Sequence, residues 1–245
     1  MRTLVLGDCH GGYKALMQCL KDCYFDYEKD KLIFLGDVAD GWSQTPQCVE
    51  EFMKMKNLIM IMGNHDFWCI EWLKTGATPL IWTEQGGRAT IKAYRYEMAN
   101  PDSRISLQKH LDFLNKAHYY YIDDQNRIFT HGGFNKHKPV REQHKDEFLW
   151  DRVLAEEVIT KAGEGVKEFK EVYLGHTSVW QFSEGPMAFE NVICMDTGAG
   201  WEGKLSIMDI DTKEVWQSDI VSQLYPVEGG RYGRKDIWDK LYGKL

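Results

Sequence analysis

A short apolar run that ends in a glycine-containing turn recurs along this chain, and this feature constrains the fold most. The first three runs span residues 4–6, 31–35 and 58–62, and each is followed by a segment compatible with a helix. Because their apolar residues are consecutive rather than alternating, we expect strands buried on both faces. A strand, turn and helix that repeat roughly every 30 residues form a βαβ unit, which predicts a parallel sheet.

Shorter apolar runs characterise the second half of the chain. Those at 127–130, 172–174 and 192–195 end in His-Gly-Gly, Gly-His-Thr and Asp-Thr-Gly, and those at 205–210 and 214–216 indicate an antiparallel pair. We therefore predict an α/β fold, namely a four-layer α/β/β/α sandwich in which helices flank two mixed β-sheets.

Composition excludes several classes of protein. The 30 basic and 37 acidic residues give a net charge of −7, which lacks the basic footprint of a nucleic-acid coat, so we expect no stable nucleic-acid binding. No apolar stretch approaches the ~20 residues of a membrane span and no secretory signal is recognisable, so we expect no membrane association. Six cysteines without a Cys-x-x-Cys pair predict reduced thiols and a cytoplasmic protein.

Polar side chains follow the apolar runs at the point where each run ends. The candidates are Asp8, His10, Asp37, Asn64, His131 and His176. Because ligands of α/β sheets bind at the carboxyl ends of the strands, we expect these six to converge. Carboxylate, imidazole and amide groups are ligands for Mn, Fe or Zn. Six ligands exceed what one tetrahedral zinc needs, so two metals that share one carboxylate fit better.

A simpler interpretation exists for each candidate taken alone. Glycine pairs with Asp or His are common in turns, and an Asp beside a helix start is usually an N-cap. The shared position of all six candidates, each directly after an apolar run, favours the metal site.

Five ordered segments also carry a resemblance. Residues 7–11, 36–40, 63–66, 131–133 and 175–177 read Gly-Asp-Cys-His-Gly, Gly-Asp-Val-Ala-Asp, Gly-Asn-His-Asp, His-Gly-Gly and Gly-His-Thr. Together they resemble the calcineurin-like metallophosphoesterase superfamily, and most closely its bacterial and phage serine/threonine-type phosphatases and diadenosine tetraphosphate hydrolases. The likeness extends from residue 3 to about residue 215, and five ordered blocks are far more specific than one short motif.

The resemblance implies a role for each residue of these blocks. Asp8 and His10 would hold one metal, Asp37 would bridge both, and Asn64, His131 and His176 would hold the other. His65 stands where the family places a general acid, Asp40 where it orients that histidine, and Arg152 and Asn64 match groups that bind the substrate phosphate. The implied mechanism is in-line attack by a metal-bridging hydroxide without a phosphoenzyme. The implied cofactors are two divalent ions, with Mn expected first and Fe or Zn as alternatives.

The second block departs from the family pattern. The family continues with Asp-Arg-Gly, whereas this chain has Asp40-Gly41-Trp42, so an arginine that would contact the substrate phosphate is absent. Arg88 is one candidate replacement. Trp42 either stacks on a nucleobase or is a core aromatic residue.

We therefore expect a two-metal phosphoesterase that hydrolyses phosphomonoesters, with serine/threonine-type phosphatase activity as one form. The alternatives are a nucleotide or dinucleoside polyphosphate phosphodiesterase and a catalytically weak metal-binding scaffold. The expected partner is a phosphorylated small molecule, a nucleotide or a phosphoprotein, and the oligomeric state is open. We expect a single domain over 1–245, with a helical insertion around 93–120 and a variable loop around 134–160.

Overall fold

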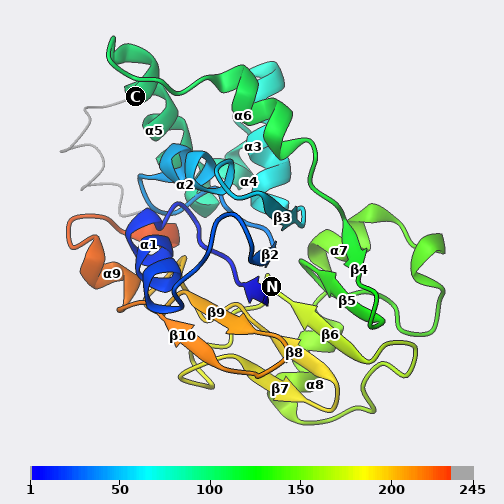
Figure 1. The fold of residues 1–245 in the computed structure, drawn as a ribbon. Helices are drawn as coiled ribbons and strands as arrows, with labels where there is room; N and C mark the ends of the chain where they lie inside the picture. The colour runs from blue at the N-terminus through cyan, green and yellow to red at the C-terminus, as the bar shows by residue number, and fades with distance from the viewer. Residues whose placement is uncertain (1, 233–245) are drawn as a thin grey trace.

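The computed structural model describes residues 2–232 (Figure 1). Its first sheet has the strand order β10-β9-β1-β2-β3. The strands are β1 (Thr3–Leu6), β2 (Lys31–Phe34), β3 (Asn57–Met60), β9 (Ser206–Asp209) and β10 (Val215–Gln217). β1, β2 and β3 are parallel, whereas β9 and β10 are antiparallel, as the sequence pattern predicted.

The second sheet has the order β4-β5-β6-β8-β7. Its strands are β4 (Tyr120–Ile122), β5 (Arg127–Thr130), β6 (Glu171–Leu174), β7 (Met187–Phe189) and β8 (Val192–Cys194). The three central strands are parallel, and β4 and β7 pair antiparallel at the two edges.

The two sheets pack face to face. Val5 and Ile33 of the first sheet share an apolar cluster with Phe129 and Tyr173 of the second, whose rings stack with centroids 4.9 Å apart. Since side chains alternate along a strand, the neighbouring residues face the other way, and Phe34, for example, packs against helices. Both faces of the central strands are therefore buried, as their consecutive apolar residues predicted. The same prediction was wrong for β3, which is an edge strand whose first three residues are only partly buried.

Helices cover the outer faces of both sheets, so the four-layer sandwich predicted from the sequence is confirmed. On the first sheet lie α1 (Tyr13–Asp22), α2 (Thr45–Phe52), α3 (Asn64–Thr75), α4 (Leu80–Trp82), α5 (Arg88–Ala99) and α6 (Leu107–Leu114). On the second sheet lie α7 (Lys145–Trp150) and α8 (Val153–Thr160), and α9 (Val221–Leu224) lies near the end of the described chain. A π-helical turn, Thr83–Gly87, joins α4 to α5, and 3₁₀ turns lie at Val140–Glu142 and Gly230–Tyr232.

The segment 93–120 contains most of α5 and all of α6, and the segment 134–160 contains α7 and α8. No helix within residues 2–232 has the length and apolar character that a membrane crossing requires.

Candidate metal centre and active site

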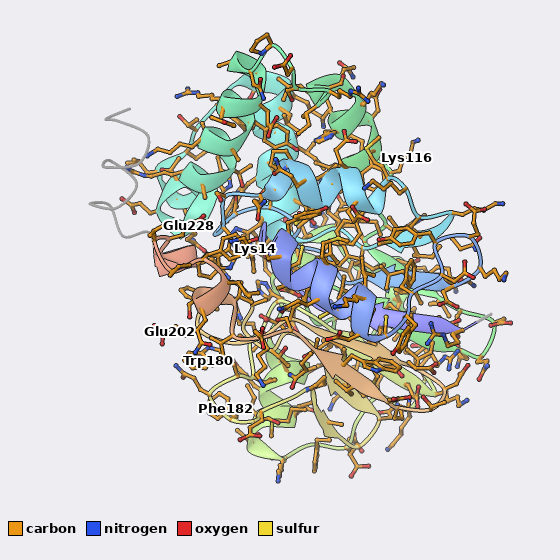
Figure 2. All side chains as sticks on the ribbon, turned by 60° about the vertical axis from the view of Figure 1, so that its left-hand side comes forward. Lys14, Lys116, Trp180, Phe182, Glu202 and Glu228 are labelled. Carbon is orange, nitrogen blue, oxygen red and sulfur yellow. The ribbon has the colours of Figure 1, made fainter. Side chains whose placement is uncertain are left out.

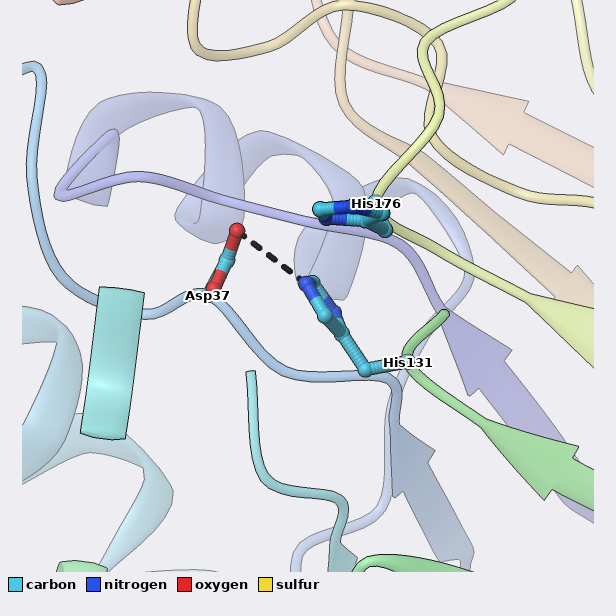
Figure 3. A group of neighbouring side chains, drawn as sticks. All are labelled: Asp37, His131 and His176. Carbon is cyan, nitrogen blue, oxygen red and sulfur yellow. Dashed lines mark ion pairs between the residues drawn. The ribbon is translucent and has the colours of Figure 1, made fainter. Parts of the chain in front are cut away.

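The six candidate ligands meet at the carboxyl ends of strands from both sheets. They are 0 to 6% exposed, and they follow β1, β2, β3, β5 and β6. The ligand atoms of Asp8, His10 and Asp37 lie within 4.8 Å of one another, and so do those of Asp37, His131 and His176 (Figure 3). Asn64 joins the second group, since its Oδ1 lies 3.0 Å from Nε2 of His131. Two groups that share Asp37 are the arrangement that two ions with one bridging carboxylate require.

Backbone carbonyl groups set the orientation of two of the histidines. Nδ1 of His10 donates to the carbonyl of Ala39 at 3.0 Å, and Nδ1 of His131 donates to the carbonyl of Leu35 at 2.9 Å. Because a carbonyl oxygen can only accept, Nδ1 carries the proton in each ring. Nε2 of each ring then points toward the set of candidate ligands that contains Asp37. Metal sites whose histidines are fixed by a second hydrogen bond have the same arrangement.

Several of these ligand atoms are buried without a hydrogen-bond partner. They are Oδ1 of Asp8, Nε2 of His10 and Nε2 of His176. A buried polar atom without a partner costs about 1–3 kcal/mol, so their convergence indicates a ligand at this place. Carboxylate oxygens and imidazole nitrogens in this mixture suit divalent ions of the Mn, Fe or Zn type. The residues present therefore fit two such ions.

The charges of the cluster depend on one another. Burial raises the pKa of Asp37, but the neighbouring His131, His65 and His10 outweigh burial and hold this pKa well below its usual range. Burial lowers the pKa of His131, but Asp37 and Asp8 outweigh it and raise that pKa to about 9. Nε2 of His131 and Oδ2 of Asp37 are 3.3 Å apart. A metal cation held by His131 would require this nitrogen to be unprotonated.

His65 and Asp40 form a buried pair beside the cluster. Nδ1 of His65 lies 2.6 Å from Oδ2 of Asp40, and Asp40 also accepts from Nε1 of Trp82 at 2.6 Å and from the hydroxyl of Thr90 at 2.8 Å. Burial raises the pKa of Asp40 to about 8 and lowers that of His65 to about 3, so the pair holds one proton at neutral pH. Nε2 of His65 is buried without a partner, and its ring packs edge-on against His10 with centroids 5.2 Å apart.

Asp66 holds the loop that carries Asp37, a role that the sequence pattern did not reveal. Its carboxylate accepts the backbone N–H groups of Asp37 and Val38 at 2.8 Å and those of Ala39 and Gly63 at 3.2 Å. Its position directly after Asn64-His65 was the available signal. One buried carboxylate at the start of α3 thus fixes the end of β2 to the end of β3.

The backbone at this edge is unusual. His10, Asp37, Asp40 and His176 have φ between 46 and 74°, in the left-handed region that side chains other than glycine rarely adopt. Such strain persists where the surrounding structure imposes it and is concentrated at functional sites.

Comparison with models of protein families then identifies the family of this chain. The family model for calcineurin-like phosphoesterases matches residues 1–198. The chain belongs to the calcineurin-like phosphoesterase family. It is a metal-dependent phosphoesterase, and its family depends on a binuclear metal centre.

This phosphoesterase has relatives with two kinds of name. Serine/threonine-protein phosphatase 1 of Salmonella typhimurium is 24% identical over 208 residues, which cover 84% of this chain and 90% of the relative. The symmetrical bis(5'-nucleosyl)-tetraphosphatase of Pseudomonas fluorescens is 24% identical over 284 aligned positions, which cover 91% and 96%. A solved structure assigned as a diadenosine tetraphosphatase matches with a TM-score of 0.61 at 17% identity, covering 88% of this chain and 92% of that one.

Arg152 of the phosphoesterase lies at the rim of the site. It is exposed, and its Nη1 donates to Oγ1 of Thr177 at 3.0 Å and to the carbonyl of His176 at 3.4 Å. Trp150 lies beside it with 41% of its surface exposed, and its ring is edge-on to His176 with centroids 6.0 Å apart. A cation and an aromatic ring thus lie beside His176, one of the candidate ligands.

The structure decides between the two interpretations of Trp42. The side chain is 1% exposed, its Nε1 donates to the carbonyl of Ala199 at 2.6 Å, and its ring stacks on Tyr225. It is a core residue of the phosphoesterase, so stacking on a nucleobase is ruled out. The Arg88 side chain makes no hydrogen bond or ion pair with any residue in 2–232, whereas the stem of Arg231 lies beside the candidate ligand His10.

Proposed function

We propose that this phosphoesterase hydrolyses phosphomonoesters with two divalent ions held by the two groups that share Asp37. The ligands would be Asp8, His10, Asp37, Asn64, His131 and His176. The shared carboxylate carries the proposal, because a bridged pair of ions is the arrangement that clamps a phosphate ester. Mn²⁺ is the first metal to test, followed by Fe and Zn.

The ions would supply Lewis acidity and lower the pKa of a water molecule. The chain's own residues then have separate tasks. With Asp40 protonated, Nδ1 of His65 accepts from it and the free Nε2 carries the ring's own proton, so Nε2 would donate that proton to the leaving oxygen while Nδ1 takes the proton of Asp40. Asp40 would keep the ring of His65 in place, and Arg152 and Asn64 would bind the phosphate oxygens.

Hydrolysis of a small monoester and a small diester tests the proposal. Purified protein is loaded with Mn²⁺, and kcat/KM is compared for p-nitrophenyl phosphate, bis-p-nitrophenyl phosphate and phosphoserine or phosphothreonine peptides. Higher activity on the monoester supports a phosphatase, and activity on the peptides supports a phosphoprotein substrate. Higher activity on the diester would favour the phosphodiesterase alternative. If no substrate is hydrolysed with any of the three metals, the remaining alternative is a catalytically weak metal-binding scaffold.

A second candidate substrate is a dinucleoside polyphosphate. Its support is the exposed indole of Trp150, which borders His176 and offers a stacking surface for a base. A Trp150→Ala variant tests this candidate. It should raise KM for a dinucleoside tetraphosphate and leave KM for p-nitrophenyl phosphate unchanged, whereas equal changes for both substrates would contradict it.

A cytoplasmic location is part of the proposal. Its support is the state of the six cysteines, all of which are buried and free of disulfide bonds.

A further inference from the structure

After residue 198, where the family match ends, the chain runs back to the candidate metal ligands. This part of the chain places the cation of Arg231 beside them. α9 begins at Val221, and the described chain continues past Arg231. The backbone N–H of Arg231 donates to the carbonyl of Gly200 at 2.9 Å, and its guanidinium carbon lies 4.7 Å from the centre of the Trp201 ring. We call residues 221–231 the C-terminal segment.

The turn after β2 holds this segment in place. The Tyr225 ring stacks on Trp42 with centroids 5.2 Å apart, and its hydroxyl donates to Oε1 of Gln44 at 2.6 Å. Glu228 accepts from the backbone N–H and the hydroxyl of Ser43 at 2.9 and 2.7 Å. Figure 2 shows Glu228 at the edge of the molecule where this segment lies. Trp42, which departs from the family pattern, is therefore the docking position of the segment.

Glycines on both sides leave room for the Arg231 stem beside His10. A Cβ at Gly41 would lie 3.3 Å from Cγ of Arg231. A Cβ at Gly200 would lie 2.8 Å from Cδ of Arg231 and 2.5 Å from Cδ2 of His10. The stem therefore passes between Gly41 and Gly200, next to a metal-ligand candidate.

The charge of this guanidinium lacks a carboxylate partner within residues 2–232. Nε is buried without a hydrogen bond, and Nη2 donates to Oε1 of Gln85 only at 3.5 Å. Burial is the main cause that lowers the pKa of His10 and the pKa of Arg152, and the charge of Arg231 is the second cause for both. This half-buried cation makes no ion pair within residues 2–232, although its charge opposes burial, which raises the pKa of Asp40 and of Asp196. A cation without a salt-bridge partner beside the candidate ligands indicates an anionic ligand.

We propose that Arg231 binds the substrate phosphate together with Arg152, so that the C-terminal segment completes the binding site. This inference rests on the proposed phosphoesterase function. Two guanidinium groups favour a phosphomonoester, which carries two charges at neutral pH, over a diester, which carries one. The loss of an arginine at Gly41 and the presence of Trp42 then have one explanation: the cation comes from another part of the chain, and Trp42 docks that part.

The test uses the full-length, metal-loaded enzyme and three variants. Arg231→Met keeps an unbranched apolar stem and removes the charge, Arg231→Lys keeps a charge, and Arg104→Gln changes an exposed arginine as a control. We expect Arg231→Met to lower kcat/KM for p-nitrophenyl phosphate about 10- to 100-fold, the effect of losing a charged hydrogen bond. The fall in kcat/KM for bis-p-nitrophenyl phosphate should be smaller. Arg231→Lys should recover part of the activity that Arg231→Met loses on p-nitrophenyl phosphate.

A second readout does not depend on turnover. Inorganic phosphate should inhibit Arg231→Met less strongly and should raise its melting temperature less than that of wild type, at unchanged metal content. Activity and phosphate affinity within about twofold of Arg104→Gln, an ordinary surface effect, would overturn the inference. Equal losses on both substrates with a lower melting temperature and no recovery by lysine would also overturn it. If the wild type hydrolyses no phosphoester, the proposed function fails, and the phosphate-induced melting shift alone decides the role of Arg231.

Discussion

At the scale of single residues, the histidines of the site differ in what their free nitrogen faces. Nε2 of His131 lies within 3.3 Å of Asp37, the shared carboxylate, whereas His65 directs Nδ1 to Asp40 and keeps Nε2 free. Under the proposed function, this difference would separate a metal ligand from a proton donor. It leads to different expectations for metal content and for the dependence of the rate on the leaving group.

The His65→Ala variant tests this division. Turnover should fall about 10²- to 10⁴-fold for phosphoserine substrates, because their alkoxide leaving group needs a proton. The fall should be smaller for p-nitrophenyl phosphate, whose leaving group is a stable anion, and metal content should match wild type. Steady-state rates and elemental analysis give the measurements, with the exposed His137→Ala as control. Loss of metal in His65→Ala would show that His65 is a ligand.

At the scale of elements, the site depends on how the strand ends are tied to each other. Asp66, in the first turn of α3, accepts four backbone N–H groups from the loops after β2 and β3. The Asp37 loop is in turn bonded to the β1 loop, since the N–H of His10 donates to the carbonyl of Asp37 at 2.9 Å. Three loops are thus positioned through one buried carboxylate.

An Asp66→Asn variant should therefore bind metal more weakly. The amide places a donor against backbone donors, so the Asp37 loop loses its anchor, and we expect affinity for Mn²⁺ to fall about 10- to 100-fold. Competition with a chelator of known affinity measures the change. Asp22→Asn, at the exposed end of α1, is the control. Equal affinity in the two variants would mean that Asp66 does not position the metal-binding loop.

A buried histidine connects three helices on the first sheet and makes their packing sensitive to pH. His110 of α6 is 0% exposed, with Nε2 2.8 Å from Oε1 of Glu50 on α2 and Nδ1 2.8 Å from the hydroxyl of Tyr94 on α5. Burial lowers its pKa, against the opposing effect of Glu50. The neutral ring fits these contacts, with Nε2 donating to Glu50 and Nδ1 accepting from Tyr94.

The stability of this contact should fall in acid. The unfolded chain binds a proton at His110 below about pH 6.5, while the folded chain resists it, so stability is complete above that pH and is lost as pH falls toward the lowered folded pKa. The slope cannot exceed about 1.4 kcal/mol per pH unit. Urea unfolding between pH 7.5 and 5.5 should show a shallower decline in His110→Gln than in wild type or His137→Gln. Parallel declines in all three would refute this.

The sequence predicted the elements whose signal is local. Consecutive apolar residues identify a central strand such as β1, where Leu4, Val5 and Leu6 are all fully buried. The edge strands β4 and β7 have three residues each and are half exposed, so only their pairing defines them. Arg231 has no local signal at all, because its proximity to His10 exists only once the C-terminal segment has docked on Trp42.

At the scale of the whole molecule, the two sheets share one apolar interface. Phe129 of β5 is fully buried there against Tyr173 of β6, in the cluster that includes Val5 of β1. Neither sheet keeps its inner face covered without the other. This arrangement supports the expectation that the chain folds as a single domain.

A Phe129→Ala variant should therefore destabilise both sheets together. We expect a loss of about 3–5 kcal/mol in the free energy of unfolding, from lost apolar contact and the cavity that remains. Denaturant unfolding followed by tryptophan fluorescence and by circular dichroism should give one coincident transition. Phe182→Ala, at a position 59% exposed, should change stability by no more than about 0.5 kcal/mol. Two separate transitions would show that the sheets unfold independently.

The shared edge of the sheets has a practical consequence for finding the native metal. Asp8, His10, Asp37 and Asn64 come from the first sheet, whereas His131 and His176 come from the second. Ions held across that boundary would bind the folded chain and not the unfolded one, and at 1,000 times the dissociation constant each would add about 4 kcal/mol to stability. A thermal-denaturation screen over metals would therefore rank candidate ions by affinity, and chelation would lower the melting temperature. The preferred ion can then be identified before any substrate is known.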